Sequence, residues 1–302
     1  MTVAETASPT AAQTVEALPE RHTSRLIAQR EFLAPVVAQA VAALRLPAGA
    51  WVLDAGTGTG GALPPLARAS RSAGHVRAVD LDAAVLAIAG AHAGRGGVAA
   101  RVSVESADVV DVLAAAATDP AGGFDAIWAG DLVGPGTFQD PGATVAAMAR
   151  ALRPGGVVAL FSSTCLPPTF LPGHPELERL VRAASQRRRR VPAGGPHHPD
   201  QHLAWLVAAG LDDVTPTVLS RVGFPADRDP AARTHLECVV WPEMLTSATT
   251  FGATVGMTAD DVNQLRALIT PGSTRYVVDG PGYFVHQPTL LTTGRHRRCG
   301  RR

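Results

Sequence analysis

Short apolar runs alternate with stretches of helical periodicity through the middle of the chain, over residues 50–165. A short apolar run bounded by turn residues is typical of a buried strand, and apolar positions three to four residues apart are typical of a helix that packs by one face. Strands that alternate with helices in this way form a parallel sheet. We therefore expect an α/β fold in which helices cover both faces of a mostly parallel sheet.

The pattern is looser on either side of this core. The expected segments are a disordered N-terminus over 1–20, N-terminal helices over 21–49, the core over 50–165, an insertion over 166–199, a core helix and strand over 200–225, a helical insertion over 226–280, the last strand over 281–294 and a basic disordered tail over 295–302. Within them the patterns predict helices at 23–46, 175–190 and 199–210, the last capped by Asp200 and ended by Gly210, and strands at 213–224 and 283–293.

Both insertions would emerge above the carboxyl ends of the strands. Together with the N-terminal helices they could roof a pocket, and pockets for small molecules are mostly apolar. Five large apolar side chains in the insertions either line this pocket or fill the insertions' own core: Phe170, Trp241, Met244, Phe251 and Met257.

The segment VLDAGTGTGG, residues 52–61, carries the most specific motif. Its apolar start predicts a strand, its glycines a tight turn, and the following GALPPLARA a helix that tolerates Pro64 and Pro65 only in its first turn. A glycine-rich turn between strand and helix lets a ligand lie against bare backbone close to a helix N-terminus. We therefore expect a nucleotide-like ligand at this turn.

Two ligand classes use such a turn. Gly56, Gly58 and Gly61 satisfy the dinucleotide pattern GxGxxG, which is weak evidence in a chain with 30 glycines. Asp54 precedes the first glycine by two positions, and its carboxylate would repel a pyrophosphate but could accept hydrogen bonds from an ammonium group or support the turn. A ligand that combines an amino acid with a nucleoside and has no phosphate, such as S-adenosylmethionine, fits better.

On these residues the chain resembles the class I S-adenosylmethionine-dependent methyltransferases, in the small-molecule branch of the ubiquinone and menaquinone biosynthesis type. Further markers follow in the family's order: HVRAVDLD with Asp80, RVSVESADVVD with Asp108, FDAIWAGD with Asp131, and ALRPGGVVALFSS with a turn at residues 154–156. The resemblance implies a Rossmann-like seven-stranded sheet whose last strand is antiparallel, with the N-terminal helices as a lid over the cofactor.

The resemblance also implies a set of cofactor contacts. Asp80 would bind both ribose hydroxyls, Leu81 would lie against the adenine, and Asp108 with Val109 beside it would contact the adenine amino group. The glycines would admit the methionine end, and the end of the fourth strand would face the transferred methyl. The full set expected to bind S-adenosylmethionine is Asp54, Ala55, Gly56, Thr57, Gly58, Gly60, Asp80, Leu81, Asp108, Val109, Ala129 and Gly130.

Methyl transfer from a sulfonium is an in-line displacement, so the protein mainly has to align the two reactants and exclude water. A general base helps when the acceptor is a hydroxyl or an acidic carbon, and histidine suits this role. Asp131 at the end of the fourth strand is one candidate, with hydrogen bonding to nearby backbone as its structural alternative. His202 and His286 are the other candidates, and each could instead be a structural histidine.

The acceptor is expected to be a small molecule. After the fourth strand the chain reads AGDLVGP and lacks the Asn/Asp-Pro-Pro-aromatic motif of many methylases that act on nucleic-acid bases or on glutamine, which favours oxygen or carbon over nitrogen. We expect a role in bacterial natural-product biosynthesis. Two alternatives stay open: a methyltransferase-fold protein that binds the cofactor without methyl transfer, as a cyclase, decarboxylase or regulatory binder, and an NAD-dependent oxidoreductase.

Composition adds mainly negative expectations. A net charge of +1 gives no reason to expect a nucleic-acid partner. We expect no apolar run to span a membrane. Cys165, Cys238 and Cys299 lack the spacing of metal ligands and suit a reduced, cytoplasmic setting. HHPDQH (197–202) reads as a loop and cap rather than a metal site, and QRRRR (186–190) as a solvated helix end that could also attract an anionic substrate. A homodimer is compatible with the sequence.

Overall fold

A computed structural model describes residues 11–119, 123–134, 136–192, 194–195, 197–226 and 229–297, with side chains from residue 22 onward except that of Pro199. Within this part of the chain seven strands form one sheet in the order β3-β2-β1-β4-β5-β7-β6. The strands are β1 (Trp51–Ala55), β2 (His75–Asp80), β3 (Val102–Ser106), β4 (Phe124–Gly130), β5 (Leu152–Ser162), β6 (Asp212–Gly223) and β7 (Val285–Arg295).

The sheet is parallel from β3 to β5, and β7 runs antiparallel to both β5 and β6. This confirms the expected seven-stranded, mostly parallel sheet with an antiparallel last strand. The chain order reverses between the neighbours β1 and β4. Ligands of open α/β sheets bind at such a reversal, outside the carboxyl ends of the strands.

Helices cover both faces of the sheet, as expected. On one face α1, α2 and α3 pack against alternate strand residues such as Val52 and Trp128, and on the other face α4, α5 and α7 pack against their neighbours Leu53 and Ile127. The alternation follows from the two-residue period of a strand. The bounds are α1 (Ala11–Ala43), α2 (Leu63–Ala69), α3 (Ala83–Arg95), α4 (Val109–Thr118), α5 (Pro141–Arg150) and α7 (His202–Ala208).

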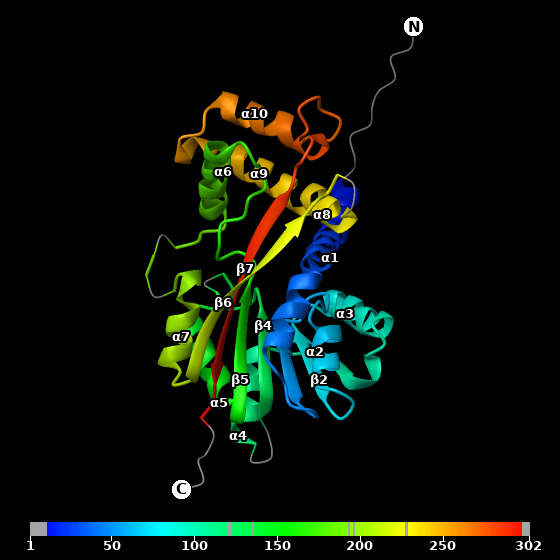
Figure 1. Ribbon diagram of the computed structural model, residues 1–302, viewed down its shortest axis with the longest axis vertical. Helices are drawn as coiled ribbons and strands as arrows, with labels where there is room; N and C mark the ends of the chain where they lie inside the picture. Colours follow the sequence, from blue (N-terminus) through cyan, green and yellow to red (C-terminus); the bar gives the residue numbers. More distant parts are fainter. Residues whose placement is uncertain are drawn as a thin grey trace.

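The two insertions form a helical cap at the end of the molecule to which the tips of β6 and β7 extend (Figure 1). Its helices are α6 (Pro175–Arg188), α8 (Pro230–His235), α9 (Trp241–Phe251) and α10 (Ala259–Ile269), with a π-helical turn η3 (Leu236–Val240) between α8 and α9. Pro242 in the first turn of α9 cannot donate a backbone hydrogen bond, and the wider π turn accommodates it.

The cap has its own hydrophobic core, which settles part of the question left open by the sequence. Trp241 and Met257 are buried in this core. Phe170 and Met244 also pack there, but in addition they line a cavity between the sheet and the cap, described below. Phe251 is half-buried and does not line that cavity.

Helix α1 differs from the expectation at its start. It begins at Ala11, so residues 11–20 are helical rather than irregular, while residues 1–10 lie outside the described residues. Residues 22–43 are long and apolar enough to cross a membrane by length and composition, which the sequence reasoning overlooked. One face of this helix is buried, through Phe32, Val36 and Ala40, against the rest of the protein. That packing is typical of a core helix.

Several local expectations are corrected. Asp200 does not cap α7: a 3₁₀ turn (Pro199–Gln201) precedes the helix, and Asp200 pairs with His198 instead. Gly210, with φ of 76°, does follow the end of that helix. Phe124 and Ala126 of β4 pair with Leu152 and Val157 of β5, so the pairing skips residues 153–156. The Pro-Gly-Gly turn expected before the fifth strand is therefore a bulge within β5. Strand β7 runs to Arg295, into the expected tail, and Cys299 lies outside the described residues.

Candidate active site

The glycine-rich turn follows β1, and three of its glycines adopt positive φ: 65° at Gly56, 51° at Gly58 and 80° at Gly60. Each conformation is costly for a residue with a side chain. A Cβ at Gly60 would lie 2.9 Å from the backbone of Ala89, so this glycine also lets α3 approach. A Cβ at Gly58 would meet no atom within 4 Å, so the backbone there faces open space.

Asp80, the last residue of β2, holds the turn in place. Its Oδ2 accepts a hydrogen bond from the Gly58 backbone N–H at 2.9 Å, and its Oδ1 accepts one from the backbone N–H of Asp82 at 3.1 Å. The next residue, Leu81, leaves 73% of its surface exposed. A carboxylate and an exposed apolar side chain therefore stand together at the mouth of the turn.

Asp54 supports the turn from beneath. It is 2% exposed, and its carboxylate accepts a hydrogen bond of 2.6 Å from the hydroxyl of Thr57. Burial raises the pKa of Asp54 to about 7, the Thr57 hydroxyl acts against this rise, and the charge of Asp80 adds to it. Asp54 was expected either to bind an ammonium group of the ligand or to support the turn. The structure shows that it supports the turn, through its bond to Thr57.

Asp108 caps α4 by accepting a hydrogen bond of 2.8 Å from the Val110 backbone N–H. The side chain of Val109 is buried, and Val110 is the exposed valine here, with 48% of its surface accessible. Val109 can therefore offer a ligand only its backbone, whose N–H lies in the unpaired first turn of the helix. The same limit applies to Ala55 and Ala129, whose side chains are in the core.

Asp131 follows β4 with φ of 51°, a strained conformation for a residue other than glycine. Its carboxylate accepts two hydrogen bonds from Ser163 at the end of β5: 2.7 Å from the backbone N–H and 2.6 Å from the hydroxyl. Surrounding protein atoms desolvate the carboxyl group and raise its pKa, while the bonds from Ser163 and the charge of Arg189 act in the opposite direction. Strained residues held by such bonds are common at functional sites.

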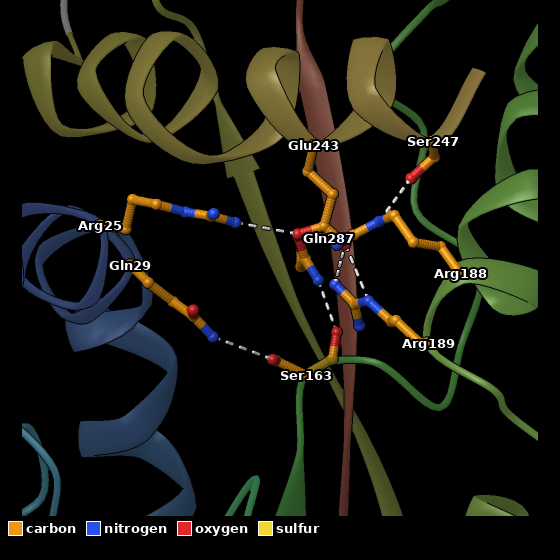
Figure 2. A network of polar contacts seen from close by, with 8 residues as sticks. All are labelled: Arg25, Gln29, Ser163, Arg188, Arg189, Glu243, Ser247 and Gln287. Carbon is orange, nitrogen blue, oxygen red and sulfur yellow. Dashed lines mark hydrogen bonds and ion pairs between the residues drawn. The ribbon is translucent and has the colours of Figure 1, made fainter. Parts of the chain in front are cut away.

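A cavity of about 460 Å³ opens above Ser163, between the sheet and the cap. Ser163 also accepts a bond of 2.5 Å at its carbonyl from Gln287 of β7, and its hydroxyl lies 3.5 Å from Nε2 of Gln29 on α1. Figure 2 shows the side chains of Gln29 on α1 and Gln287 on β7 both pointing to Ser163. Three segments far apart in sequence thus meet at the floor of this cavity.

Arginines gather around Glu243 on the cap side of the cavity (Figure 2). The side chain of Glu243 is 13% exposed and forms ion pairs with Arg25 at 3.1 Å, Arg188 at 2.9 Å and Arg189. Arg188 also donates to the hydroxyl of Ser247 at 2.9 Å. Burial alone would raise the pKa of Glu243, but the three guanidinium groups outweigh it and hold the pKa below its ordinary value.

The two histidines proposed as bases lie elsewhere. His202 is 3% exposed, lies 3.4 Å from the carbonyl oxygen of Val133 and does not line the cavity. His286 lies 3.1 Å from the hydroxyl of Ser220 on β6, on the opposite face of β7 from Gln287. The prediction that these two histidines lie at the reacting centre is therefore corrected. Adjacent residues of a strand face opposite sides of the sheet, and in β7 it is Gln287 that faces the cavity.

His235 and His198 are the histidines that line the cavity. His235 is 5% exposed and stacks on Phe32 at 4.4 Å between ring centroids. Its Nδ1 has no hydrogen-bond partner among the described residues, and burial lowers its pKa to about 4.

In the HHPDQH segment, His198 pairs with Asp200, whereas the His202 ring lies next to the carbonyl oxygen of Val133. No group of three or more metal-binding side chains forms among the residues described.

Sequence reasoning missed Ser163, Gln29, Gln287 and Glu243. Ser163 carried a weak signal, because it directly follows the fifth strand at the carboxyl edge. Arg189 lay in the QRRRR run that was noted for a possible anionic substrate. The two glutamines and Glu243 had no signal, since their partners are more than 50 residues away.

The comparisons with known proteins agree with this architecture. A family model described as a methyltransferase domain matches residues 52–156. A ubiquinone biosynthesis O-methyltransferase from Xanthomonas axonopodis pv. citri (strain 306) is 33% identical over 184 residues, which cover 59% of this chain and 70% of that protein.

Solved structures are more distant. One is a Bacillus halodurans protein described as a methyltransferase, with 16% identity and a TM-score of 0.48 over 86% of this chain and 98% of that chain. Another is a Geobacter sulfurreducens S-adenosylmethionine-dependent methyltransferase in complex with S-adenosyl-L-homocysteine, with 21% identity and a TM-score of 0.42 over 84% of this chain and 89% of that chain.

The sheet, the glycine-rich turn at the strand reversal and the curated relative define the class together. The chain belongs to the class I S-adenosylmethionine-dependent methyltransferases. It is an enzyme of this class, and its cofactor is S-adenosylmethionine. This membership decides against the alternative of an NAD-dependent oxidoreductase.

Proposed function

We propose that the protein methylates oxygen or carbon of a small molecule that binds in the cavity above Ser163. The observation that carries the proposal is the Ser163–Asp131 pair, because Asp131 belongs to the end of β4 and Ser163 to the cavity lining. The cleft at the strand ends and the cavity under the cap therefore share one wall, where a methyl donor and an acceptor would meet.

The residues present fit S-adenosylmethionine in the cleft. The carboxylate of Asp80 would bind the ribose hydroxyls, and the exposed side chains of Leu81 and Val110 offer apolar surface to the adenine. Asp108 would contact the adenine amino group. Open space at Gly58 leaves room for the methionine end against the backbone, whereas a side chain there would fill it.

S-adenosylmethionine supplies a methyl group that its sulfonium already activates. The protein's own residues then have three tasks: they align the acceptor, they exclude water and they accept a proton where the acceptor is a hydroxyl or an acidic carbon. The cap and α1 cover the cavity and so exclude water from it. Asp131, with its raised pKa, and His235, which is neutral because burial lowers its pKa, are two titratable groups placed to accept a proton.

The experiment is a transfer assay with methyl-labelled S-adenosylmethionine and a small-molecule extract of the source organism. We expect label in a low-molecular-weight product, together with formation of S-adenosylhomocysteine. Tight binding of the cofactor without any transfer would favour the other open alternative, a cofactor-binding cyclase, decarboxylase or regulator. Product analysis would also separate methyl ethers and esters from C-methyl and N-methyl compounds.

Bacterial natural-product biosynthesis is the setting that we propose for this activity, with the enzyme in the cytoplasm. The Ala-, Gly-, Pro- and Arg-rich composition is typical of a high-GC bacterial genome, and the curated relative is bacterial. The genes next to the gene for this protein test this setting. Neighbouring biosynthetic genes would support it, and an operon for nucleic-acid or protein modification would contradict it.

A further inference from the structure

We propose that the methyl acceptor is an acid, an apolar molecule whose carboxylate or phosphate binds Arg189 and Arg182 in the cavity. This inference rests on the proposed function, since it names the substrate class of the same cavity. It depends on the charges of the cavity wall, on the unused donors of these two arginines and on their position relative to Asp131.

Guanidinium groups outnumber glutamate carboxylates around the cavity. Arg182 and Arg189 line it together with Glu178 and Glu243. Arg25 and Arg188 also pair with Glu243 but lie outside the lining. The guanidinium group of Arg182 makes no hydrogen bond or ion pair within the described part of the chain, although its charge acts on Glu178. A bound carboxylate or phosphate would supply a further counter-charge to these guanidinium groups.

Glu178, the carboxylate on which the charge of Arg182 acts, is held by other donors. Glu178 is 9% exposed, and its two oxygens accept backbone hydrogen bonds from Phe170 at 2.5 Å and Leu171 at 3.3 Å. Its oxygens thus anchor the loop that enters the cap. Burial raises the pKa of Glu178, which makes its ionised form less favourable.

Arg189 has donors to spare. Its Nε and Nη2 both donate to one oxygen of Glu243, at 2.8 Å for Nε, so Nη1 makes no hydrogen bond to the described residues. Guanidinium groups bind carboxylate and phosphate oxygens through paired N–H donors. A ligand anion could therefore bind Nη1 of Arg189 without displacing Glu243.

The position of these arginines fits an acceptor for methyl transfer. Arg189 lines the same cavity as Ser163, which donates two hydrogen bonds to Asp131 at the end of β4. The anion site therefore opens onto the cavity whose floor adjoins the strand end where the methyl would be delivered. Between the charged groups the wall is apolar, through Leu166, Phe170, Val181, Val240 and Met244. A hydrophobic acid would place its apolar part there and its anionic group on the arginines.

Equilibrium binding of three probes to the protein loaded with S-adenosylhomocysteine tests the inference: 2-naphthoate, 2-naphthyl phosphate and the uncharged 2-naphthamide. We expect at least one anion to bind about tenfold or more tightly than the amide, as for a charge-assisted hydrogen bond in a half-buried site. Carboxylate and phosphate are then distinguished by which probe binds better. R189Q and R182Q should each remove most of this preference.

The matched control is R187Q, because Arg187 is an exposed neighbour on the same helix that does not line the cavity. Its preference for the anion should equal that of the wild type. Equal binding of amide and anions, no binding of either anion, retention of the preference in both R189Q and R182Q, or its loss in R187Q would each overturn the inference. Failure of the wild type to bind S-adenosylhomocysteine would instead contradict the proposed function.

Discussion

Ser163 donates two hydrogen bonds to the carboxylate of Asp131, one from its backbone N–H at 2.7 Å and one from its hydroxyl at 2.6 Å. The two residues follow the neighbouring strands β5 and β4, so the pair joins the carboxyl ends of these strands. Because Asp131 has positive φ, the bonds also hold a backbone conformation that is unfavourable by itself. This pair fixes the wall between the cavity and the cleft in which we propose that the cofactor binds.

We expect Ser163→Ala to lower the free energy of unfolding by about 1.5–3 kcal/mol, because it removes a nearly buried hydrogen bond to a charged group. Denaturant unfolding measures this loss. Ser162→Ala is the matched control: among the described residues its hydroxyl accepts hydrogen bonds from the backbone N–H of Thr164 and the thiol of Cys165, both neutral donors, so we expect a loss of about 1 kcal/mol or less. Equal losses in the two variants would show that the bond to Asp131 has no special weight.

Gly58→Ala should weaken the binding of S-adenosylhomocysteine by about tenfold or more, since the new methyl group would enter the space assigned to the methionine end. Gly97→Ala is matched in backbone and space, with φ of 69° and no atom within 4 Å of the new Cβ, but it lies in the turn after α3. Both variants should lose about 1–2 kcal/mol of stability, from the left-handed conformation. Only Gly58→Ala should lose affinity for S-adenosylhomocysteine. Equal affinities of the two variants would mean that the ligand does not lie against Gly58.

His235 makes stability depend on pH. Burial lowers its pKa to about 4 in the folded state, against about 6.5 in the unfolded chain, so the unfolded state binds the proton first as the pH falls. Between pH 6.5 and pH 4 this costs about 3 kcal/mol of stability, and the penalty is absent above pH 6.5. His235→Phe keeps a ring against Phe32 and removes the proton.

Chemical denaturation of both proteins at pH 7 and pH 4 measures this difference. Other carboxyl and imidazole groups titrate in both proteins, so the comparison isolates His235. The wild type should lose about 3 kcal/mol more than the variant between the two pH values. Parallel losses would mean that the imidazole is not desolvated as the structure shows.

The sequence predicted well what neighbouring residues determine. The strand, the turn at Gly56, Gly58 and Gly60 and the helix after it are local, since positive φ and a missing side chain are properties of single positions. The acids Asp80, Asp108 and Asp131 lie at or after strand ends, as predicted, because the alternating pattern fixes where each strand ends.

The sequence could not predict contacts that depend on how distant segments pack. His286 and Gln287 are adjacent in one strand, and a shift of a single residue decides which of them faces the cavity. His202 shows the same limit on a helix, where burial against the loop at Val133 depends on tertiary packing. Glu243 meets its arginines only because the cap folds over α1, which no local pattern encodes.

The central claim is that Asp80 binds the adenosyl group beside the glycine-rich turn, and calorimetric titration with S-adenosylhomocysteine tests it most directly. The wild type should bind with measurable heat, and Asp80→Ala should bind about tenfold or more weakly, because it loses a charged acceptor. Asp82→Ala, which removes only the cap of α3, should bind as the wild type does. No heat with the wild type, or equal affinity of Asp80→Ala and the wild type, would contradict the claim.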